Sequence, residues 1–366
     1  LSGGEAQRIR LATQIGSQLV NVLYILDEPS IGLHQRDNAR LIKSLQQLRD
    51  IGNSVIVVEH DKDMIEIADH ILDIGPKAGL HGGAIVAQGK LKDIKASNSL
   101  TAQYLNGKKS ISVPTERRKP TGSIQLFGAN GNNLQNVDLE IPLGVLTCVT
   151  GVSGSGKTSL VKGILYPAVL RETQQYSTQR IGEVKEIKGD FSSFSAVELV
   201  DQNPIGKSSR SNPVTYVKAY DAIRELFSTM PIAKQRGFKT KHFSFNVDGG
   251  RCDNCQGEGE EVVEMQFMAD LHLTCEECNG KKFKEEVLEV EFKQKSIYDV
   301  LNLTVEEAVD FFRGQKTIVN KLLPLQEVGL GYVKLGQSSN SLSGGEAQRI
   351  KLATFLGKSQ NKDKVL

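Results

Sequence analysis

Short apolar runs, separated by longer segments with helical spacing, dominate the hydrophobic pattern of the chain. The length and composition of these runs predict buried strands. A helix is predicted at residues 35–50, and another directly after residue 158. Apolar strands that alternate with helices predict an α/β fold with parallel-sheet cores. The predicted strands lie at residues 22–27, 54–58, 145–150 and 198–202.

Alternation of apolar and polar residues marks two further segments. Residues 132–144 alternate directly ahead of the strand at 145–150, which predicts an edge hairpin leading into that strand. Residues 261–268 alternate as well and predict a second hairpin. Cys148 falls inside the predicted strand 145–150, so we expect its side chain to pack in the core.

Composition divides the chain into three parts. Residues 95–121 are polar and interrupted by Pro114 and Pro120, which predicts a partly extended linker. The basic triplet at 117–119 within it is more typical of a solvated link than of a binding site. We therefore expect a first domain at 1–95, a linker at 96–121 and a second domain at 122–366 with an inserted module at about 203–340.

Overall composition restricts the class of protein. The chain has 366 residues, 39% of them hydrophobic and 24% charged, which is typical of a soluble globular protein. Its formal net charge of +2 means that any surface for a polyanion must be a local patch. No apolar run reaches roughly 18 residues and no signal peptide is visible. Four of five cysteines form CxxC pairs, which favours a reducing compartment. We expect a cytoplasmic protein with no membrane partner.

A glycine-rich loop follows the predicted strand at 145–150. Residues 151–158 match G-x-x-x-x-G-K-[ST], between a strand and a helix. In this motif the backbone N–H groups and the helix N-terminus bind phosphate oxygens. Lys157 is expected to neutralise the β- and γ-phosphates of a nucleoside triphosphate, and Thr158 to bind Mg²⁺. The predicted nucleotide-binding residues are Gly151, Ser153, Gly154, Ser155, Gly156, Lys157, Thr158 and Ser159.

Acidic residues end the predicted strand at 22–27. Ligands bind at the carboxyl ends of strands in open α/β sheets, so Asp27 is expected to hold Mg²⁺ through water. Glu28 is expected to polarise the attacking water. His60 follows the predicted strand at 54–58. By itself it favours a structural role, but beside these carboxylates it predicts a contact to the γ-phosphate.

Two CxxC pairs predict a metal site. Nineteen residues separate the pair Cys252 and Cys255 from the pair Cys275 and Cys278. Four thiolates at this spacing are typical of tetrahedral structural Zn²⁺, and glycines after each pair suit tight turns. Buried free cysteines or two disulfides are the alternatives. The alternating segment between the pairs indicates that the metal holds the base of a hairpin.

A basic segment at 207–251 predicts a nucleic-acid surface. It holds nine Lys or Arg and three acidic residues, with aromatic residues interleaved, among them Tyr216, Tyr220, Phe238, Phe243 and Phe245. Such a segment suits contact with a phosphate backbone, although a solvated helical face is the alternative. No base-reading motif is visible, so we expect shape-directed binding. The predicted DNA-binding residues are Lys207, Arg210, Lys234, Arg236, Lys239, Lys241 and Arg251.

The chain contains a repeat. Residues 342–353 repeat residues 1–12, LSGGEAQRIRLA, with Lys351 in place of Arg10. The LSGG signature, the strand ending in Asp-Glu and the strand ending in His together resemble an ATP-binding cassette. The resemblance implies that each signature caps an ATP bound to a facing cassette, and that Gln202 contacts Mg²⁺ and senses the γ-phosphate. The signature residues are Ser2, Gly3, Gly4, Ser343, Gly344 and Gly345.

Two cassettes in one chain, with a CxxC-x19-CxxC module between phosphate loop and signature, resemble the UvrA family. Residues 200–206 and 210–213 are also similar to that family. The resemblance spans essentially the whole chain. It implies an ATP-driven homodimer that scans double-stranded DNA for damage in nucleotide excision repair and delivers a UvrB-type partner. The first phosphate loop and the second Asp-Glu strand are absent, so we expect a fragment whose own ATP hydrolysis is in doubt.

Other functions and arrangements remain open at this point. A transporter cassette shares the loop and signature but explains neither the cysteine pairs nor the second signature. A zinc module that binds DNA, with ATP only as a structural ligand, is the other alternative. The two half-cassettes either pack face to face, with Ser2 near the phosphate loop, or close into one permuted sheet with Asp27 beside Thr158. We expect face-to-face packing.

Overall fold

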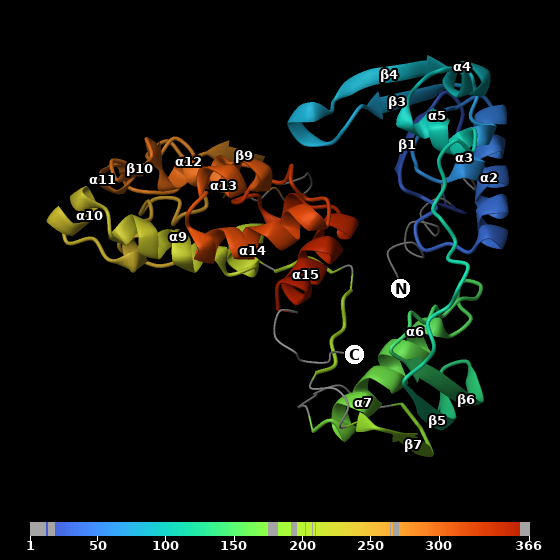
Figure 1. The fold of residues 1–366 in the computed structure, drawn as a ribbon. Helices are drawn as coiled ribbons and strands as arrows, with labels where there is room; N and C mark the ends of the chain where they lie inside the picture. Colours follow the sequence, from blue (N-terminus) through green and yellow to red (C-terminus); the bar gives the residue numbers. More distant parts are fainter. Residues whose placement is uncertain are drawn as a thin grey trace. The chain divides into compact units, whose positions relative to one another are not determined.

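The chain folds into two compact units (Figure 1). Unit 1 comprises Leu1–Val197 with Lys364–Leu366, and unit 2 comprises Glu198–Asp363. The computed structural model describes residues 12–13, 19–174, 182–191, 196–201, 203–206, 208, 210–263, 265 and 271–358.

A parallel strand pair and one helix begin unit 1. Strand β1 (Leu23–Asp27) pairs in parallel with β2 (Ser54–Val58), with Asp27 opposite Val58. Helix α2 (Gln35–Asp50) runs alongside them (Figure 1), as the sequence predicts for 35–50. Its Leu41, Leu45 and Leu48 recur at helical spacing and pack against the buried face of β1. This packing fixes the carboxyl ends of both strands at one edge.

The next part of unit 1 is an antiparallel strand pair with short helices. Strands β3 and β4 pair with each other, and α5 lies within the segment predicted as a linker. Residues 106–121 have no regular secondary structure. The bounds are α3 Lys62–Ile67, β3 Ile71–Gly75, the 3₁₀ helix η1 Gly79–His81, β4 Ala84–Gly89, α4 Leu91–Ala96 and α5 Leu100–Leu105.

A three-stranded antiparallel sheet contacts the glycine-rich loop through one of its turns. Strands β5 (Gly122–Gly131) and β6 (Leu134–Leu143) form the predicted hairpin, which is therefore confirmed. The strand order is β6-β5-β7, with β7 at Glu186–Gly189. One face packs on the helix after the loop, through Leu160, Ile164 and Val169. That helix comprises α6 (Lys157–Leu160), a π-helical turn η2 (Val161–Leu165) and α7 (Tyr166–Glu172).

Three predicted strands differ from expectation. Residues 145–150 form no strand, Leu146 is 99% exposed, and Cys148 is exposed rather than packed in a core. No described strand lies beside this segment, so its backbone groups and apolar side chains find no partner that would bury them. Residues 197–201 are likewise not a strand. Strand β2 forms but is exposed at every second residue instead of buried throughout.

Unit 2 is mainly helical and is built around one large apolar core. Phe227, Phe243, Phe283, Phe312 and Leu322 are each at most 1% exposed within it. The helices are α8 Pro213–Tyr216, α9 Ala219–Ser228, α10 Pro231–Gln235, α11 Glu285–Leu288, α12 Ile297–Asn302, α13 Val305–Phe311, α14 Lys316–Glu327 and α15 Gly344–Lys358, with 3₁₀ helices η4 Thr240–Phe243 and η5 Ser339–Ser341. The strands pair as two hairpins, β8 Glu260–Val263 with β9 Leu271–Thr274, and β10 Glu291–Phe292 with β11 Lys295–Ser296.

No helix in the described part of the chain is long and apolar enough to cross a membrane.

Candidate functional site

The glycine-rich loop has the backbone shape that its motif requires. Gly151, Gly154 and Gly156 have φ angles of 149°, 76° and 98°, which L side chains rarely adopt. The Lys157 ammonium donates to the carbonyl oxygens of Gly151 at 2.7 Å and Val152 at 2.8 Å. Its positive charge therefore lies at the mouth of the loop, directly before the helix N-terminus. This arrangement suits a bound phosphate chain.

Two asparagines that the sequence analysis missed support the loop. They lie in the turn between β5 and β6. Asn133 Nδ2 donates to the Gly154 carbonyl at 2.9 Å, and Asn132 Nδ2 donates to Ser159 Oγ at 3.1 Å. A Cβ at Gly156 would lie only 2.9 Å from Asn133 Oδ1. The alternating hairpin pattern predicted the turn, but only the fold shows that it contacts the loop.

One N–H group of the loop already faces an anion. The backbone N–H of Ser153 donates to Asp37 Oδ2 at 3.4 Å. Burial acts to raise the pKa of Asp37, but the hydrogen bonding from Ser153, together with the neighbouring Arg36, outweighs it and leaves the pKa below its ordinary value. The loop therefore stabilises a carboxylate, as expected of a site for negatively charged groups.

The predicted catalytic residues Glu28 and His60 lie together. Glu28 Oε1 is 3.4 Å from His60 Nε2 at the carboxyl edge of the β1–β2 pair. Glu28 has a φ of 43°, and its N–H donates to the Val58 carbonyl at 2.9 Å. A non-glycine residue in this region stores backbone strain, which is common at functional sites. Asp27, the predicted magnesium ligand, is exposed at the same edge.

Glu59 organises this edge and was not predicted from the sequence. Its Oε1 accepts the Ser30 N–H at 2.8 Å, and its Oε2 accepts the N–H groups of His60 and Asp61 at 3.0 and 3.3 Å. Burial raises the pKa of Glu59, but these donors hold it below the ordinary value. Glu59 therefore joins the segments after β1 and β2. Its signal in the sequence was its place beside His60.

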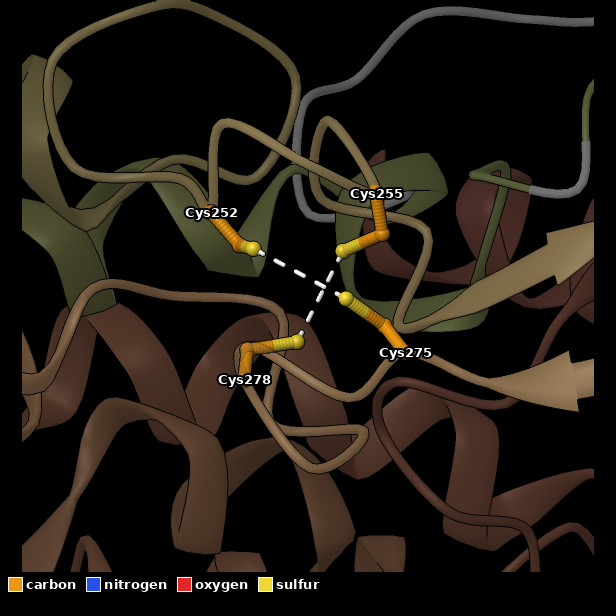
Figure 2. A group of neighbouring side chains, drawn as sticks. All are labelled: Cys252, Cys255, Cys275 and Cys278. Carbon is orange, nitrogen blue, oxygen red and sulfur yellow. Dashed lines mark hydrogen bonds between the residues drawn. The ribbon is translucent and has the colours of Figure 1, made fainter.

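The four predicted metal ligands converge in unit 2 (Figure 2). All four sulfur atoms lie within 4.8 Å of one another and are buried. Cys252 Sγ is 3.9 Å from Cys275 Sγ, and Cys255 Sγ is 3.6 Å from Cys278 Sγ. Ligands about 2.3 Å from a tetrahedral zinc are about 3.8 Å apart, so these separations fit zinc and are too long for disulfide bonds.

The loops that carry the cysteines are shaped by left-handed turns. The residues after each second cysteine, Gln256 and Asn279, have φ angles of 51° and 49°. Gly257 follows with a φ of 86°, and a Cβ there would lie 2.1 Å from the Phe245 carbonyl oxygen. The predicted glycine turns are confirmed. The β8–β9 hairpin starts directly beside Cys275, so the four cysteines lie at a hairpin base as predicted, and that a metal holds this base stays a prediction.

The thiols of the cluster differ in acidity. Burial raises the pKa of Cys252 to about 12. Burial also acts to raise the pKa of Cys275, but a backbone N–H from Cys278 and the Asn254 side-chain amide lower it to about 7. Cys275 is therefore the thiol most ready to become a thiolate, the form that binds metal.

The second signature begins helix α15 through a capping box. Ser343 Oγ accepts the Glu346 N–H at 3.2 Å, and Glu346 Oε2 accepts the Ser343 N–H at 2.8 Å. The other carboxylate oxygen accepts the Tyr332 hydroxyl at 2.6 Å. Burial raises the pKa of Tyr332, and the neighbouring Glu346 carboxylate raises it further. Gly344 and Gly345 are thus held at a helix N-terminus, where backbone N–H groups are free to meet an anion.

The basic segment keeps only part of its predicted surface. Lys234, Lys239 and Lys241 are exposed and make no ion pair within the described chain. Arg210, Arg236 and Arg251 are paired with Glu258, Glu289 and Asp248. Three of the interleaved aromatic residues cannot stack on a nucleic acid, because Tyr220, Phe243 and Phe245 are buried in the large core of unit 2, while Tyr216 and Phe238 are half-buried.

Some predicted residues lie outside the described chain, namely Ser2, Gly3, Gly4, Gln202 and Lys207. Among the described residues, β1–β2 and β6-β5-β7 are separate sheets. The permuted alternative, with Asp27 and Thr158 in one continuous sheet, is therefore not formed. Face-to-face packing depends on Ser2 and stays a prediction.

Comparison with known proteins identifies the family. No family model matches the chain. UvrABC system protein A of Clostridium tetani is 57% identical over 360 residues, which are 98% of this chain and 38% of that protein. The Aquifex aeolicus protein of the same name is 54% identical over 363 residues. UvrA2 from Deinococcus radiodurans, a crystal structure, superposes with a TM-score of 0.93 at 48% identity, over 98% of this chain and 43% of that chain. The chain belongs to the UvrA family.

Membership of the UvrA family confirms the resemblance drawn from the signatures, the phosphate loop and the cysteine pairs. The fold is that of a UvrA-type ATP-binding cassette with an inserted four-cysteine hairpin. The chain spans about two fifths of the length of the curated relatives that it matches.

We predict that Glu59 contributes pH-dependent stability to unit 1. Its pKa is depressed in the folded state, so its contribution is complete above the ordinary value of 4.5 and is lost as the pH falls through the folded value. Glu59→Gln should therefore lower the free energy of unfolding near neutral pH. The difference in unfolding free energy from wild type should become smaller as the pH is lowered. Urea unfolding across the native pH range measures this. Asp69→Asn is the control, because Asp69 is an exposed carboxylate that pairs with Arg49. A destabilisation by Glu59→Gln that is independent of pH would contradict the prediction.

Proposed function

We propose that the intact protein is an ATP-binding-cassette ATPase that recognises damaged DNA in nucleotide excision repair. The observation that carries the proposal is the juxtaposition of Glu28 and His60 at the carboxyl edge of a parallel strand pair, in a chain that also holds a phosphate loop. UvrA-family membership agrees with this reading. The division into a first cassette at 1–95, a linker at 96–121 and a second cassette at 122–366 is part of the proposal.

Each nucleotide contact has a proposed role. The loop N–H groups and Lys157 bind the β- and γ-phosphates of one ATP, and Thr158 binds its Mg²⁺; Asp27, in the other cassette, binds the Mg²⁺ of the opposite ATP. Glu28 accepts a proton from the attacking water, and His60 contacts the γ-phosphate. Gln202 senses the γ-phosphate of the ATP held by Lys157. Two cassettes facing each other place Ser2, Gly3 and Gly4 over the ATP held by Lys157, while Ser343, Gly344 and Gly345 serve the opposite ATP.

Further parts of the proposal concern partners and location. From the family resemblance we propose a homodimer that works in the cytoplasm. It binds double-stranded DNA and delivers a UvrB-type partner. The transporter alternative is disfavoured because it gives no role to the four-cysteine cluster.

We predict that Glu28→Gln in the full natural protein lowers kcat for ATP by at least about 100-fold, because a general base of this kind contributes roughly 10²- to 10⁴-fold. ATP binding should persist, since the Lys157 loop is unchanged. Steady-state ATPase assays and nucleotide binding measure the two effects. Glu66→Gln is the matched control, because it removes a half-buried carboxylate whose partner is Lys95. A wild-type protein without ATPase activity would leave only the zinc-module alternative.

We further propose that Cys252, Cys255, Cys275 and Cys278 bind one structural Zn²⁺ as thiolates. Protein produced without chelator should contain about one zinc per chain by elemental analysis. Cys275→Ser should lower the zinc content, whereas Cys148→Ser, at the exposed fifth cysteine, should not. Zinc affinity should decrease as the pH is lowered, because protons then compete with zinc for the thiolates. Equal zinc content in both variants would refute this site.

We propose that Lys234, Lys239 and Lys241 contribute to a duplex-binding surface, together with Lys207 and the arginines at 210, 236 and 251. Replacing the three lysines by Ala should weaken binding similarly for all sequences and reduce the slope of log affinity against log salt by up to about 0.9 per lost contact. Lys108→Ala with Lys109→Ala, exposed lysines of unit 1, is the control. Fluorescence anisotropy with duplex DNA at several salt concentrations provides the measurement, and an unchanged slope would argue against the patch.

A further inference from the structure

Unit 2 contains a hollow that none of the sites described above uses. Its volume of about 470 Å³ lies within the range of roughly 300–1,000 Å³ that is typical of small-molecule sites. Its lining comes from the turn before α8, the turn after the second cysteine pair, α12, and the chain that leads into the second signature. The lining residues Phe245 and Leu301 are 2% and 5% exposed, whereas Asn302 and Lys334 are exposed. The hollow therefore has a floor in the folded core and a rim in solvent.

Positive charge without a counter-ion marks the hollow. Lys282 and Lys334 both line it, and among the described residues no Asp or Glu does. Neither ammonium makes an ion pair within the described chain, whereas Lys284, two residues along, pairs with Asp253. The Lys282 ammonium lies 5.9 Å from the centre of the Phe245 ring, which is part of the floor. Like charges beside one hollow repel each other, and a bound anion would offset that repulsion.

Glu346 does not neutralise these lysines. The lining residue Tyr332 donates its hydroxyl to Glu346 Oε1 at 2.6 Å, and Glu346 Oε2 accepts the Ser343 N–H at 2.8 Å. Both carboxylate oxygens are thus engaged, one by Tyr332 and the other by the cap of α15. Within the described chain Glu346 makes no ion pair with either lysine of the hollow, so the hollow still favours an anion.

The other side chains of the hollow suit a planar ring. Tyr298 lines it, is half-buried, and is not part of the large apolar core of unit 2. Neither the Tyr298 hydroxyl nor the Gln337 side-chain amide bonds to another described residue. Asn302 uses its Nδ2 for the Tyr298 carbonyl at 3.1 Å, which leaves its Oδ1 to accept. An aromatic ring outside the core, with amide donors and acceptors around the same hollow, is what recognition of a nucleobase requires.

We propose that this hollow binds one nucleotide by its terminal phosphate, at a site separate from the phosphate loop. Lys282 and Lys334 hold the phosphate, Tyr298 stacks on the base, and Gln337 and Asn302 contact the edge of the base. A terminal phosphate monoester carries about −1.5 to −2 charges near neutral pH, so it matches two ammonium groups better than a phosphodiester with one charge. The same group occurs in a free nucleoside monophosphate and at the phosphorylated end of a DNA strand.

Calorimetric titration of the full natural protein with thymidine 5′-monophosphate tests the proposal, after an excess of a non-hydrolysable ATP analogue has filled the phosphate loops. We expect one additional nucleotide per chain. Lys282→Met combined with Lys334→Met keeps both apolar stems and should weaken the affinity at least about 10-fold. Tyr298→Leu should weaken it about 10-fold through lost stacking. Lys316→Met, at an exposed lysine of unit 2 outside the hollow, is the control and should leave the affinity unchanged.

Two measurements on the wild type need no variant. Thymidine without its phosphate should bind at least about 10-fold more weakly than the monophosphate, because the lysines then lose their partner. A short DNA single strand should be titrated with and without a 5′-phosphate. A gain in affinity from the phosphate that is lost in the double-lysine variant assigns the site to strand ends as well, and no gain assigns it to free nucleotides alone.

Equal thermal unfolding midpoints of wild type and variants show that a lost affinity is not a lost fold. No binding of thymidine monophosphate or of the phosphorylated strand end by the wild type would overturn the proposal. An affinity unchanged in both the double-lysine variant and Tyr298→Leu would do the same. ATPase activity, measured in parallel, tests the function proposed above, and its outcome does not decide this site.

Discussion

The structure of unit 1 depends on the pairing of β1 with β2. A parallel strand needs partners for its backbone groups and cover for both apolar faces. These two strands supply each other's hydrogen bonds, and α2 covers one face, while Leu23, Ile25, Ile56 and Val58 on the other remain exposed. The register that places Asp27 opposite Val58 is enough to bring Glu28 to His60, and Glu59 fixes the two following segments.

Unit 2 meets the same requirement in another way. A single apolar core takes up the aromatic residues of the basic segment, and the four thiols hold the hairpin base beside it. Burial of those rings removes them from any stacking role, and ion pairs occupy three of the predicted arginines. The predicted basic residues without an ion pair in the described chain are lysines, whose flexible point charges suit contact with a phosphate backbone without base recognition.

The second signature is held at several points by different forces. Glu346 uses one carboxylate oxygen for the helix cap and the other for Tyr332, so a glutamate at this position acts twice as an acceptor. Apolar residues seat the middle of α15 in the core, and Lys351 bonds to Asp201.

Local sequence determined the features that depend on short-range geometry. Glycine positions defined the phosphate loop, cysteine spacing defined the four-thiol cluster, leucine spacing defined α2, and alternation defined the β5–β6 hairpin. Tertiary structure decided whatever depends on a distant partner. Residues 145–150 have a strand composition but no neighbouring strand among the described residues, so Cys148 is exposed. Tyr220 and Phe243 are buried, and Glu59 gains its role from contacts with segments distant in the sequence. A pattern of apolar residues reports which side chains favour burial, whereas only the folded chain supplies the surface that buries them.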